Sequence, residues 1–303
     1  MLRLLPSHFF TKKLSVFISA ESIAVISNAG TFNNNNNNNT NKSSMIFTLQ
    51  TNQPAWQHAI NQLDNLLGDF LLAQQMKPKA QQVKPKTSLQ IVLGSDLVRY
   101  VALPAQTIMM NLAEKNAYAS AAFKEIHGTS ADDWQVVCND AAPQQSIIAA
   151  AIDKKLLEHL SQLALTHQLK LKSVKPYLMV VMNSLAKQLA KTTGYLAIVE
   201  HSRLTLVMLQ QGQCQQLHSH AIGDDWQAEL KHILMRESVL GDVAYRNVFI
   251  AAPTHQNPVH QNTALIVMDG WHITRIDQAS RTNSISYDGI GSDSRYAMLE
   301  AVI

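Results

Sequence analysis

The stretch Gly194 to Gln210, GYLAIVEHSRLTLVMLQ, contains two apolar runs of strand length that are joined by a short polar turn. Tyr195–Val199 leads into the turn Glu200–His201–Ser202, and Arg203–Leu209 leads out of it. Runs of Val, Ile, Leu and Tyr on both sides of a polar break are typical of a β-hairpin. We therefore expect a hairpin here, and the same design occurs once more in the chain.

The other copy of the hairpin lies near the start of the chain, where Leu14–Ile18 leads into Ser19–Ala20–Glu21–Ser22 and Ile23–Ile26 leads out. Each copy is followed by a third strand, an amphipathic helix and a further strand, so the order βββαβ occurs twice. The expected elements are Met45–Gln50, Pro54–Met76 and Ser88–Leu93 in the first unit, and Cys214–Ala221, Asp225–Leu240 and Val248–Ala252 in the second. The repeated order predicts an α/β protein with two related domains.

The segment between the two units is organised differently. After a strand at Leu97–Leu103 and a helix at about 106–126, it reads as strand, strand, helix, strand, helix. These elements are Trp134–Cys138, Ser146–Ala151, Asp153–His167, Leu169–Val174 and Pro176–Ala190. We expect an inserted α+β subdomain at about 132–191, with domains at 1–191 and 192–303. The tail is expected to add strands at Ala264–Met268 and His272–Ile276 and a helix at Ser294–Val302.

Composition limits the classes of function that the chain can serve. With 303 residues, 46% of them hydrophobic and 16% charged, it is long enough for two cores. The net charge of +3 is spread along the chain, which does not favour nucleic-acid binding. The densest basic run, Lys77 to Lys86, reads as a solvated linker, with an anionic-membrane patch as the alternative. Seven consecutive Asn residues, Asn33 to Asn39, read as a disordered loop tip.

Cysteine usage and hydropathy point to the cytoplasm. Cys138 and Cys214 are far apart and lack metal-ligand spacing, so we expect reduced thiols rather than disulfides or a zinc site. Pro6 and the Lys12–Lys13 pair interrupt the apolar N-terminus before it reaches the length of a signal peptide core. No uncharged apolar run is long enough to span a bilayer, so any membrane association is expected to be indirect.

Taken together, these segments resemble the actin-like platform proteins of type IV pilus and type II secretion machines, the PilM and GspL group. The clearest part is Ser146 to Ser184, which is similar to the family's inserted strand, helix, strand, helix subdomain. Gly194 to Gln213 corresponds to its second phosphate hairpin, and Ile222–Gly223–Asp224 to a Gly-rich turn before a helix. Val248–Pro253, VFIAAP, corresponds to a strand that ends in paired Gly beside the adenine. The resemblance implies an actin-like ATPase fold with two ribonuclease H-like domains and a small insertion.

The resemblance also locates a nucleotide site, and this sequence departs from the family there. The matching positions are Ser19, Glu21, Ser22, Glu200, His201, Ser202, Gly223 and Asp224. The family has Gly in both turns and in the adenine turn, where this chain has Ala251–Ala252–Pro253. Cβ atoms at such positions obstruct the close approach of backbone N–H groups to phosphate. We therefore expect a vestigial site without a cofactor. The alternative is a site for ATP and Mg²⁺.

Other polar groups admit a functional and a structural interpretation. Glu21 and Glu200 lie on equivalent turns and could hold a divalent metal, but two solvated carboxylates are the simpler interpretation. His218 and His220 share a strand face without a third ligand, which favours surface residues over a metal site. His201 and Ser202 are adjacent and point apart, which disfavours a nucleophile and base. Met109–Met110 and the pair Met179 and Met182 can form adaptable binding surfaces or fill the core.

The resemblance implies a cytoplasmic scaffold rather than an enzyme. Such a protein would sit at the inner membrane by binding the cytoplasmic tail of a bitopic pilus or secretion protein. We expect the docking surface at the strand Leu97 to Leu103, if it is an exposed edge, or on the insertion from Trp134 to Ser184. The alternative function is an active ATPase or a sugar-kinase-like phosphotransferase of the same superfamily. A ribonuclease H-type nuclease needs more clustered carboxylates than Glu21 and Glu200 supply.

Overall fold

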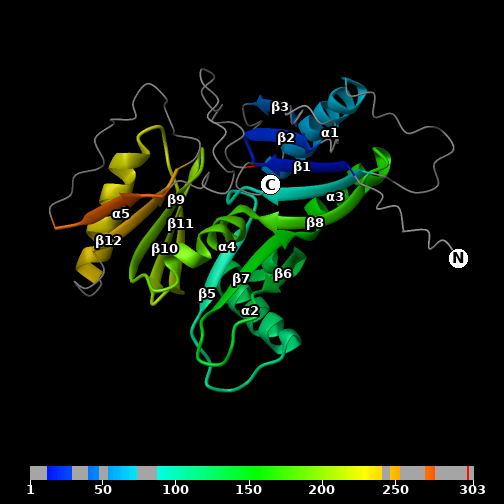
Figure 1. The fold of residues 1–303 in the computed structure, drawn as a ribbon. Helices are drawn as coiled ribbons and strands as arrows, with labels where there is room; N and C mark the ends of the chain where they lie inside the picture. Colours follow the sequence, from blue (N-terminus) through cyan, green and yellow to red (C-terminus); the bar gives the residue numbers. More distant parts are fainter. Residues whose placement is uncertain are drawn as a thin grey trace, which may run out of the picture.

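The computed structural model describes residues 12–28, 40–47, 54–73, 87–240, 246–252, 270–276 and Leu299. Within them the strands form two five-stranded sheets and one three-stranded sheet (Figure 1). Several expectations fall outside these residues: the Asn run, the Lys77–Lys86 linker, the strand Ala264–Met268 and, apart from Leu299, the closing helix. None of the helices in the described part of the chain is sufficiently long and apolar to cross a bilayer.

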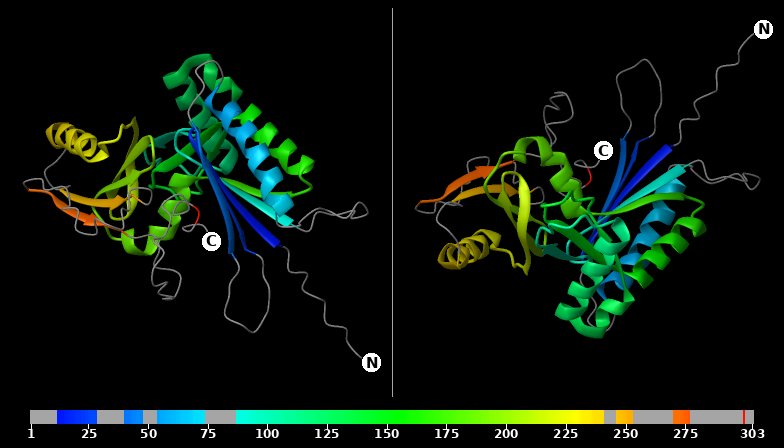
Figure 2. Two further views of the ribbon diagram at one scale, coloured as in Figure 1. Left: turned by 90° about the horizontal axis from the view of Figure 1, so that it is seen from above. Right: turned by 90° about the horizontal axis from the view of Figure 1, so that it is seen from below.

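The first sheet is built from the first hairpin and its neighbours. β1 pairs antiparallel with β2 and parallel with β4, β2 pairs antiparallel with β3, and β4 pairs parallel with β8, which gives the order β3-β2-β1-β4-β8. The strands are Lys12–Ile18 (β1), Ser22–Asn28 (β2), Thr40–Ile46 (β3), Thr87–Leu93 (β4) and Lys170–Pro176 (β8). The helices α1 (Ala55–Ala73) and α3 (Lys154–Thr166) lie together over one face, as Figure 2 shows.

The second sheet repeats this plan. Its order is β11-β10-β9-β12-β13, with β10 antiparallel to both neighbours and β12 parallel to β9 and β13. The strands are Gly194–Val199 (β9), Arg203–Gln210 (β10), Gln213–Ala221 (β11), Asn247–Ala251 (β12) and His272–Arg275 (β13), and the helix Trp226–Leu240 (α5) packs on one face. The two predicted hairpins and the repeated βββαβ order are therefore confirmed.

Alternating side chains explain the layers. Leu14, Val16 and Ile18 of β1 belong to the core with α1 and α3, whereas Phe17 belongs to the core on the opposite face. Helix α4 (Tyr177–Leu189) fills that second core between the two sheets, and the ring of Tyr177 meets Phe17 edge to face at 5.8 Å. Because both faces of the two strands are covered, β9 is a continuous apolar run, and β1 from Leu14 to Ile18 is apolar except at the buried Ser15.

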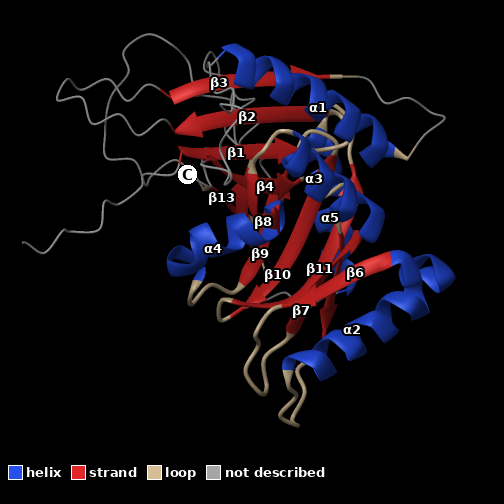
Figure 3. Cartoon of the chain, turned by 90° about the vertical axis from the view of Figure 1, so that its right-hand side faces the viewer, coloured by secondary structure: helices blue, strands red, loops and turns tan. Residues whose placement is uncertain are grey.

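The three-stranded sheet forms a small unit with its own core. Its order is β5-β7-β6, and α2 and a 3₁₀ turn cover one face (Figure 3). The elements are Arg99–Leu103 (β5), Leu112–His127 (α2), Gly128–Asp133 (3₁₀), Trp134–Cys138 (β6) and Ile147–Asp153 (β7). β5 precedes the expected insertion in the sequence but belongs to this small sheet. β8 falls within the expected insertion but belongs to the first sheet.

Three local expectations were wrong. β3 begins at Thr40 rather than Met45, because residues 40–46 pair with the whole of β2 despite their polarity. Helix α2 begins at Leu112 rather than near residue 106, because Asn111 and Glu114 form a capping box there. The strand at Leu97–Leu103 is not an open docking edge: it starts at Arg99, pairs with β7 on one side and has β11 alongside.

Candidate functional site

The two predicted turns meet between the halves of the molecule. The first turn lies between β1 and β2, and the second lies between β9 and β10. Nε2 of His201 in the second turn lies 3.7 Å from Oε2 of Glu21 in the first. His201 is thus directed at a carboxylate of the other half rather than at Ser202.

The backbone amides of the first turn form hydrogen bonds with other groups of the protein. The amide of Ser19 donates to the carbonyl of Ser22 at 2.9 Å, and the amide of Ser22 donates to the hydroxyl of Ser19 at 2.9 Å. The amide of Glu21 lies 3.4 Å from that same hydroxyl. The amide of Ala20 donates to Oδ2 of Asp96 at 2.6 Å. All four backbone donors of the turn therefore already have acceptors, and one acceptor is a carboxyl oxygen of another segment.

Glu200 of the second turn reaches across to the first half. Its side chain is buried, and its Oε2 accepts a hydrogen bond from the amide of Ser95 at 2.9 Å. Its own amide donates to the carbonyl of Arg203 at 2.8 Å, which closes the turn. The expectation that Glu21 and Glu200 are both solvated is wrong for Glu200, because its carboxylate is enclosed where the two halves meet.

Gly94 permits this close approach at the end of β4. A Cβ atom at this position would lie 2.8 Å from Oδ1 of Asp96, 3.0 Å from Cβ of Ser19 and 3.2 Å from Oε2 of Glu200. A Cβ atom hardly ever makes a contact as short as the first, and the other two are tighter than most Cβ contacts. The absence of a side chain at Gly94 is therefore what allows the two turns and the end of β4 to converge.

The two turns and the segment Gly94–Ser95–Asp96 form a junction between the halves, and burial determines its electrostatics. Burial raises the pKa of Glu200 to about 8, and the negative charge of Asp96 adds to this effect. It also raises the pKa of Asp96, against the hydrogen bond from Ala20 and the positive charge of Arg203. The pKa of Tyr100 is raised by burial and by the charge of Glu200. The junction is thus a poorly solvated acidic cluster with two guanidinium groups nearby, those of Arg203 and Arg99.

The remaining positions suggested by the resemblance lie close to the second turn. The amide of Ile222 donates to the carbonyl of Ser202 at 3.1 Å, which places the end of β11 beside the turn. Gly223 and Asp224 follow and are exposed, and a Cβ at Gly223 would meet nothing within 4 Å. Ala251 and Ala252 are buried at the end of β12, and Pro253 lies outside the described residues.

The alternative metal and binding sites can also be placed. His218 and His220 stand with ring centroids 6.4 Å apart on β11, and burial together with the charges of Arg236 and His218 lowers the pKa of His220. In the described part of the chain, no three His, Cys, Asp or Glu residues are grouped so that they could hold a metal ion. Met179 and Met182 pack against the core between the sheets, whereas Met109 is exposed.

Sequence reasoning missed the third element of the junction, Gly94–Ser95–Asp96. Asp96 lies in the turn that precedes β5. The available signal was a Gly-Ser-Asp tripeptide directly after the apolar strand at residues 88–93. What the sequence could not indicate is that this turn abuts both hairpins, since the contacts span 76 and 105 residues.

Comparison with known proteins identifies the fold. No family model and no curated protein sequence matches the chain. Among solved structures, a chain of the PilM–PilN type IV pilus biogenesis complex is similar with a TM-score of 0.58 and 12% identity, over 96% of this chain and 97% of that one. A Bacteroides thetaiotaomicron protein with an actin-like ATPase fold and unknown function is similar with a TM-score of 0.51 and 13% identity, over 83% and 84% of the two chains.

A further similar structure is the cytoplasmic domain of EpsL, an inner membrane component of the Vibrio cholerae type II secretion system. Its TM-score is 0.48, with 10% identity over 96% of this chain and 94% of that one. The two structures with the higher TM-scores establish that the chain has the actin-like ATPase fold, as the sequence resemblance implied.

Proposed function

Because the chain has the actin-like ATPase fold but fills the junction of its two halves with its own carboxylates, we propose that it is a scaffold that does not hydrolyse ATP. The observation that carries this proposal is the pair of hydrogen bonds that Ser95 donates to Glu200 and Ala20 donates to Asp96. An ATPase of this fold needs the corresponding turns free to receive phosphate. Here a carboxyl oxygen of Asp96 already accepts from the amide of Ala20 in the first turn, and the carboxyl group of Glu200 in the second turn is held by the amide of Ser95.

The chemistry of the junction disfavours a nucleotide in two ways. A phosphate would have to displace Asp96 from the amide of Ala20 and would come close to the carboxyl group of Glu200. Placing negative charge in a poorly solvated site is costly, and burial has already raised the pKa of both Glu200 and Asp96 there. Cβ atoms at Ala251 and Ala252 also stand where the resemblance places Gly beside the adenine. The residues of this chain therefore fit ATP and Mg²⁺ poorly.

We place the scaffold at the inner membrane of a pilus or secretion assembly platform, on its cytoplasmic side. There it would bind the cytoplasmic tail of a bitopic membrane protein. The support is the shared fold with a chain of the PilM–PilN complex, together with the resemblance to the PilM and GspL group. Binding, rather than chemistry, would be the activity of the protein.

Calorimetric titration of the purified protein with ATP and Mg²⁺ tests the proposal that the junction does not bind nucleotide. We expect no binding in the micromolar range, where the free energy of binding is about −8 kcal/mol. A micromolar dissociation constant would refute the filled-site argument and favour the active ATPase or sugar-kinase-like phosphotransferase. Fractionation of cells that express a tagged copy tests the proposed place at the membrane: the protein should accompany the inner membrane only while its bitopic partner is present.

A further inference from the structure

The small three-stranded unit contains a cavity away from the junction. It has a volume of about 750 Å³ and lies between residues 104–111 and 139–146, at the N-terminal end of α2. This volume is within the range of roughly 300–1,000 Å³ that is usual for pockets that bind small ligands or a few side chains.

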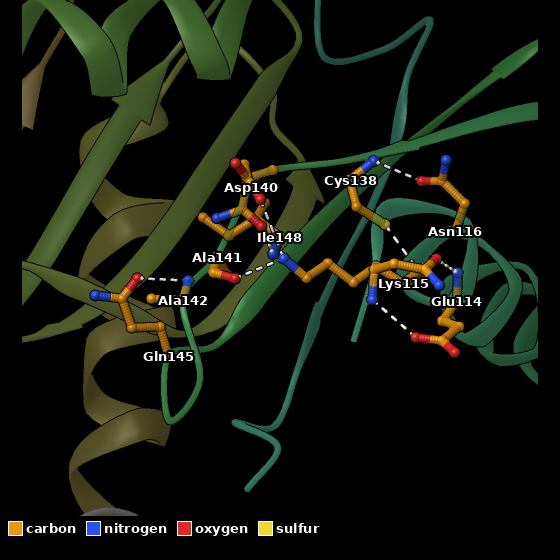
Figure 4. Close-up of polar contacts among 11 residues, drawn as sticks. Glu114, Lys115, Asn116, Cys138, Asp140, Ala141, Ala142, Gln145 and Ile148 are labelled. Carbon is orange, nitrogen blue, oxygen red and sulfur yellow. Dashed lines mark hydrogen bonds and ion pairs between the residues drawn. The ribbon is translucent and has the colours of Figure 1, made fainter. Parts of the chain in front are cut away.

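Hydrogen bonds hold the walls of the cavity in place. The amide of Gln144 in one loop donates to the carbonyl of Gln106 in the other at 2.9 Å. Asn111 and Glu114 cap α2 reciprocally, with distances of 3.0 Å and 2.7 Å. The buried ammonium of Lys115 donates to the carbonyl of Ala141 at 2.6 Å, which ties the helix to the opposite loop (Figure 4). The cavity is therefore formed before any ligand arrives.

One side of the cavity is apolar and exposed. Ile108 and Met109 line it with exposed fractions of 75% and 80%, and Leu112 in the first turn of α2 is 55% exposed. Large apolar side chains that gather on a protein surface mark an interaction site more often than scattered ones do. Met109 and the half-buried Met110 are unbranched, so this side can adapt to the shape of a ligand.

The mouth of the cavity is acidic. Among the described residues that line it, Glu114 and Asp140 carry negative charge and Lys115 carries the single positive charge. Lys115 is buried and directs its ammonium at Ala141 and Asp140, whereas the Asp140 side chain is 99% exposed. Oδ1 of Asp140 is paired with the Lys115 ammonium at 3.2 Å, and Oε2 of Glu114 caps α2, but both side chains stay exposed and the three charges sum to −1, which favours cations.

We propose that this cavity binds a short segment of the membrane partner's cytoplasmic tail that carries a Lys or Arg beside apolar side chains. The apolar residues would lie on Ile108 and Met109, and the cation would face Asp140 and Glu114. Cytoplasmic segments next to a membrane helix are enriched in Lys and Arg, which matches the acidic mouth. This inference rests on the proposed scaffold function and adds the surface and the chemistry of the tail.

The test uses the full chain, tagged, in cells that contain its bitopic partners. Met109→Asp places a charge in the middle of the apolar side, and Asp140→Lys reverses the charge at that position of the mouth. Ile126→Asp is the matched control, because Ile126 is 61% exposed near the C-terminal end of α2, about 20 Å along the helix axis from the end that borders the cavity, and does not line the cavity. We expect each cavity variant to lose at least about tenfold of its inner-membrane fraction and the control to keep it.

The outcomes separate the two proposals. Cavity variants that stay at the membrane while deletion of the partner releases the wild-type protein would overturn this inference and leave the scaffold function standing. A wild-type protein that never accompanies the membrane would overturn both. Purified variants must melt within about 4 °C of wild type, which indicates an intact domain. If the same substitutions abolish self-association in sedimentation experiments, the surface joins copies of this chain and the inference is wrong.

Discussion

Replacement of Glu200 by Gln should make the protein more stable at neutral and alkaline pH. Glu200 is 4% exposed, and its Oε2 accepts a hydrogen bond from the amide of Ser95. Burial raises its pKa from 4.5 to about 8. The amide oxygen of Gln can accept the same hydrogen bond and carries no charge at any pH. The substitution therefore removes the ionisable group with little change in shape.

The sign and size of the change in the free energy of unfolding follow from proton linkage. The unfolded chain releases the Glu200 proton near pH 4.5, whereas the folded protein keeps it until about pH 8. Between these values the folded state binds more protons, so the free energy of unfolding falls as pH rises. A tenfold difference in proton affinity is worth about 1.4 kcal/mol, so the whole interval corresponds to about 5 kcal/mol. Below pH 4.5 this contribution to stability is fully present, and above about pH 8 it is lost.

Urea unfolding at intervals from pH 4 to pH 9 measures the effect, with comparison of midpoints at constant slope. We expect Glu200→Gln to match wild type near pH 4, to exceed it by about 3 kcal/mol at pH 7 and to exceed it by about 5 kcal/mol at pH 9. Glu158→Gln, at an exposed position of α3, is the matched control and should follow wild type throughout. A Glu200→Gln curve that runs parallel to wild type over the whole range would refute the reasoning.

Two substitutions test the packing that holds the halves and the small unit together. Gly212→Ala should lower the free energy of unfolding by at least about 2 kcal/mol, because φ is +78° and the added Cβ would lie 2.6 Å from the carbonyl oxygens of Leu189 and Ala190. Gly223→Ala is its control in open space, and equal urea midpoints for the two variants would contradict the argument. Phe123→Ala should cost about 3–5 kcal/mol, since Phe123 is fully buried in the small core. Ile126→Ala on the same helix should change the unfolding free energy by less than about 0.5 kcal/mol, and thermal unfolding that fails to separate this pair would disprove the assignment of the core.

Local sequence patterns were sufficient to predict most of the secondary structure. The apolar runs around Glu200–His201–Ser202 and around Ser19–Ser22 fixed both hairpins, because short-range alternation and turn chemistry are written in adjacent residues. The N-cap Asp153 likewise located the start of α3. Predicted strand boundaries were wrong where pairing with a neighbouring strand determines them. Residues 40–46 are too polar to be predicted as a strand, but they form one because they pair with the whole of β2.

The candidate site divides in the same way. The sequence by itself determined that Gly is missing from both turns and that Glu200 replaces the expected Asp, which is sufficient to argue against a phosphate grip. Only the tertiary structure decided that Glu200 is enclosed, that it is bound by the amide of Ser95, and that Asp96 takes the amide of Ala20. Burial and long-range hydrogen bonds depend on which distant segments pack against each other. The pattern of side chains along the chain does not indicate which segments those are.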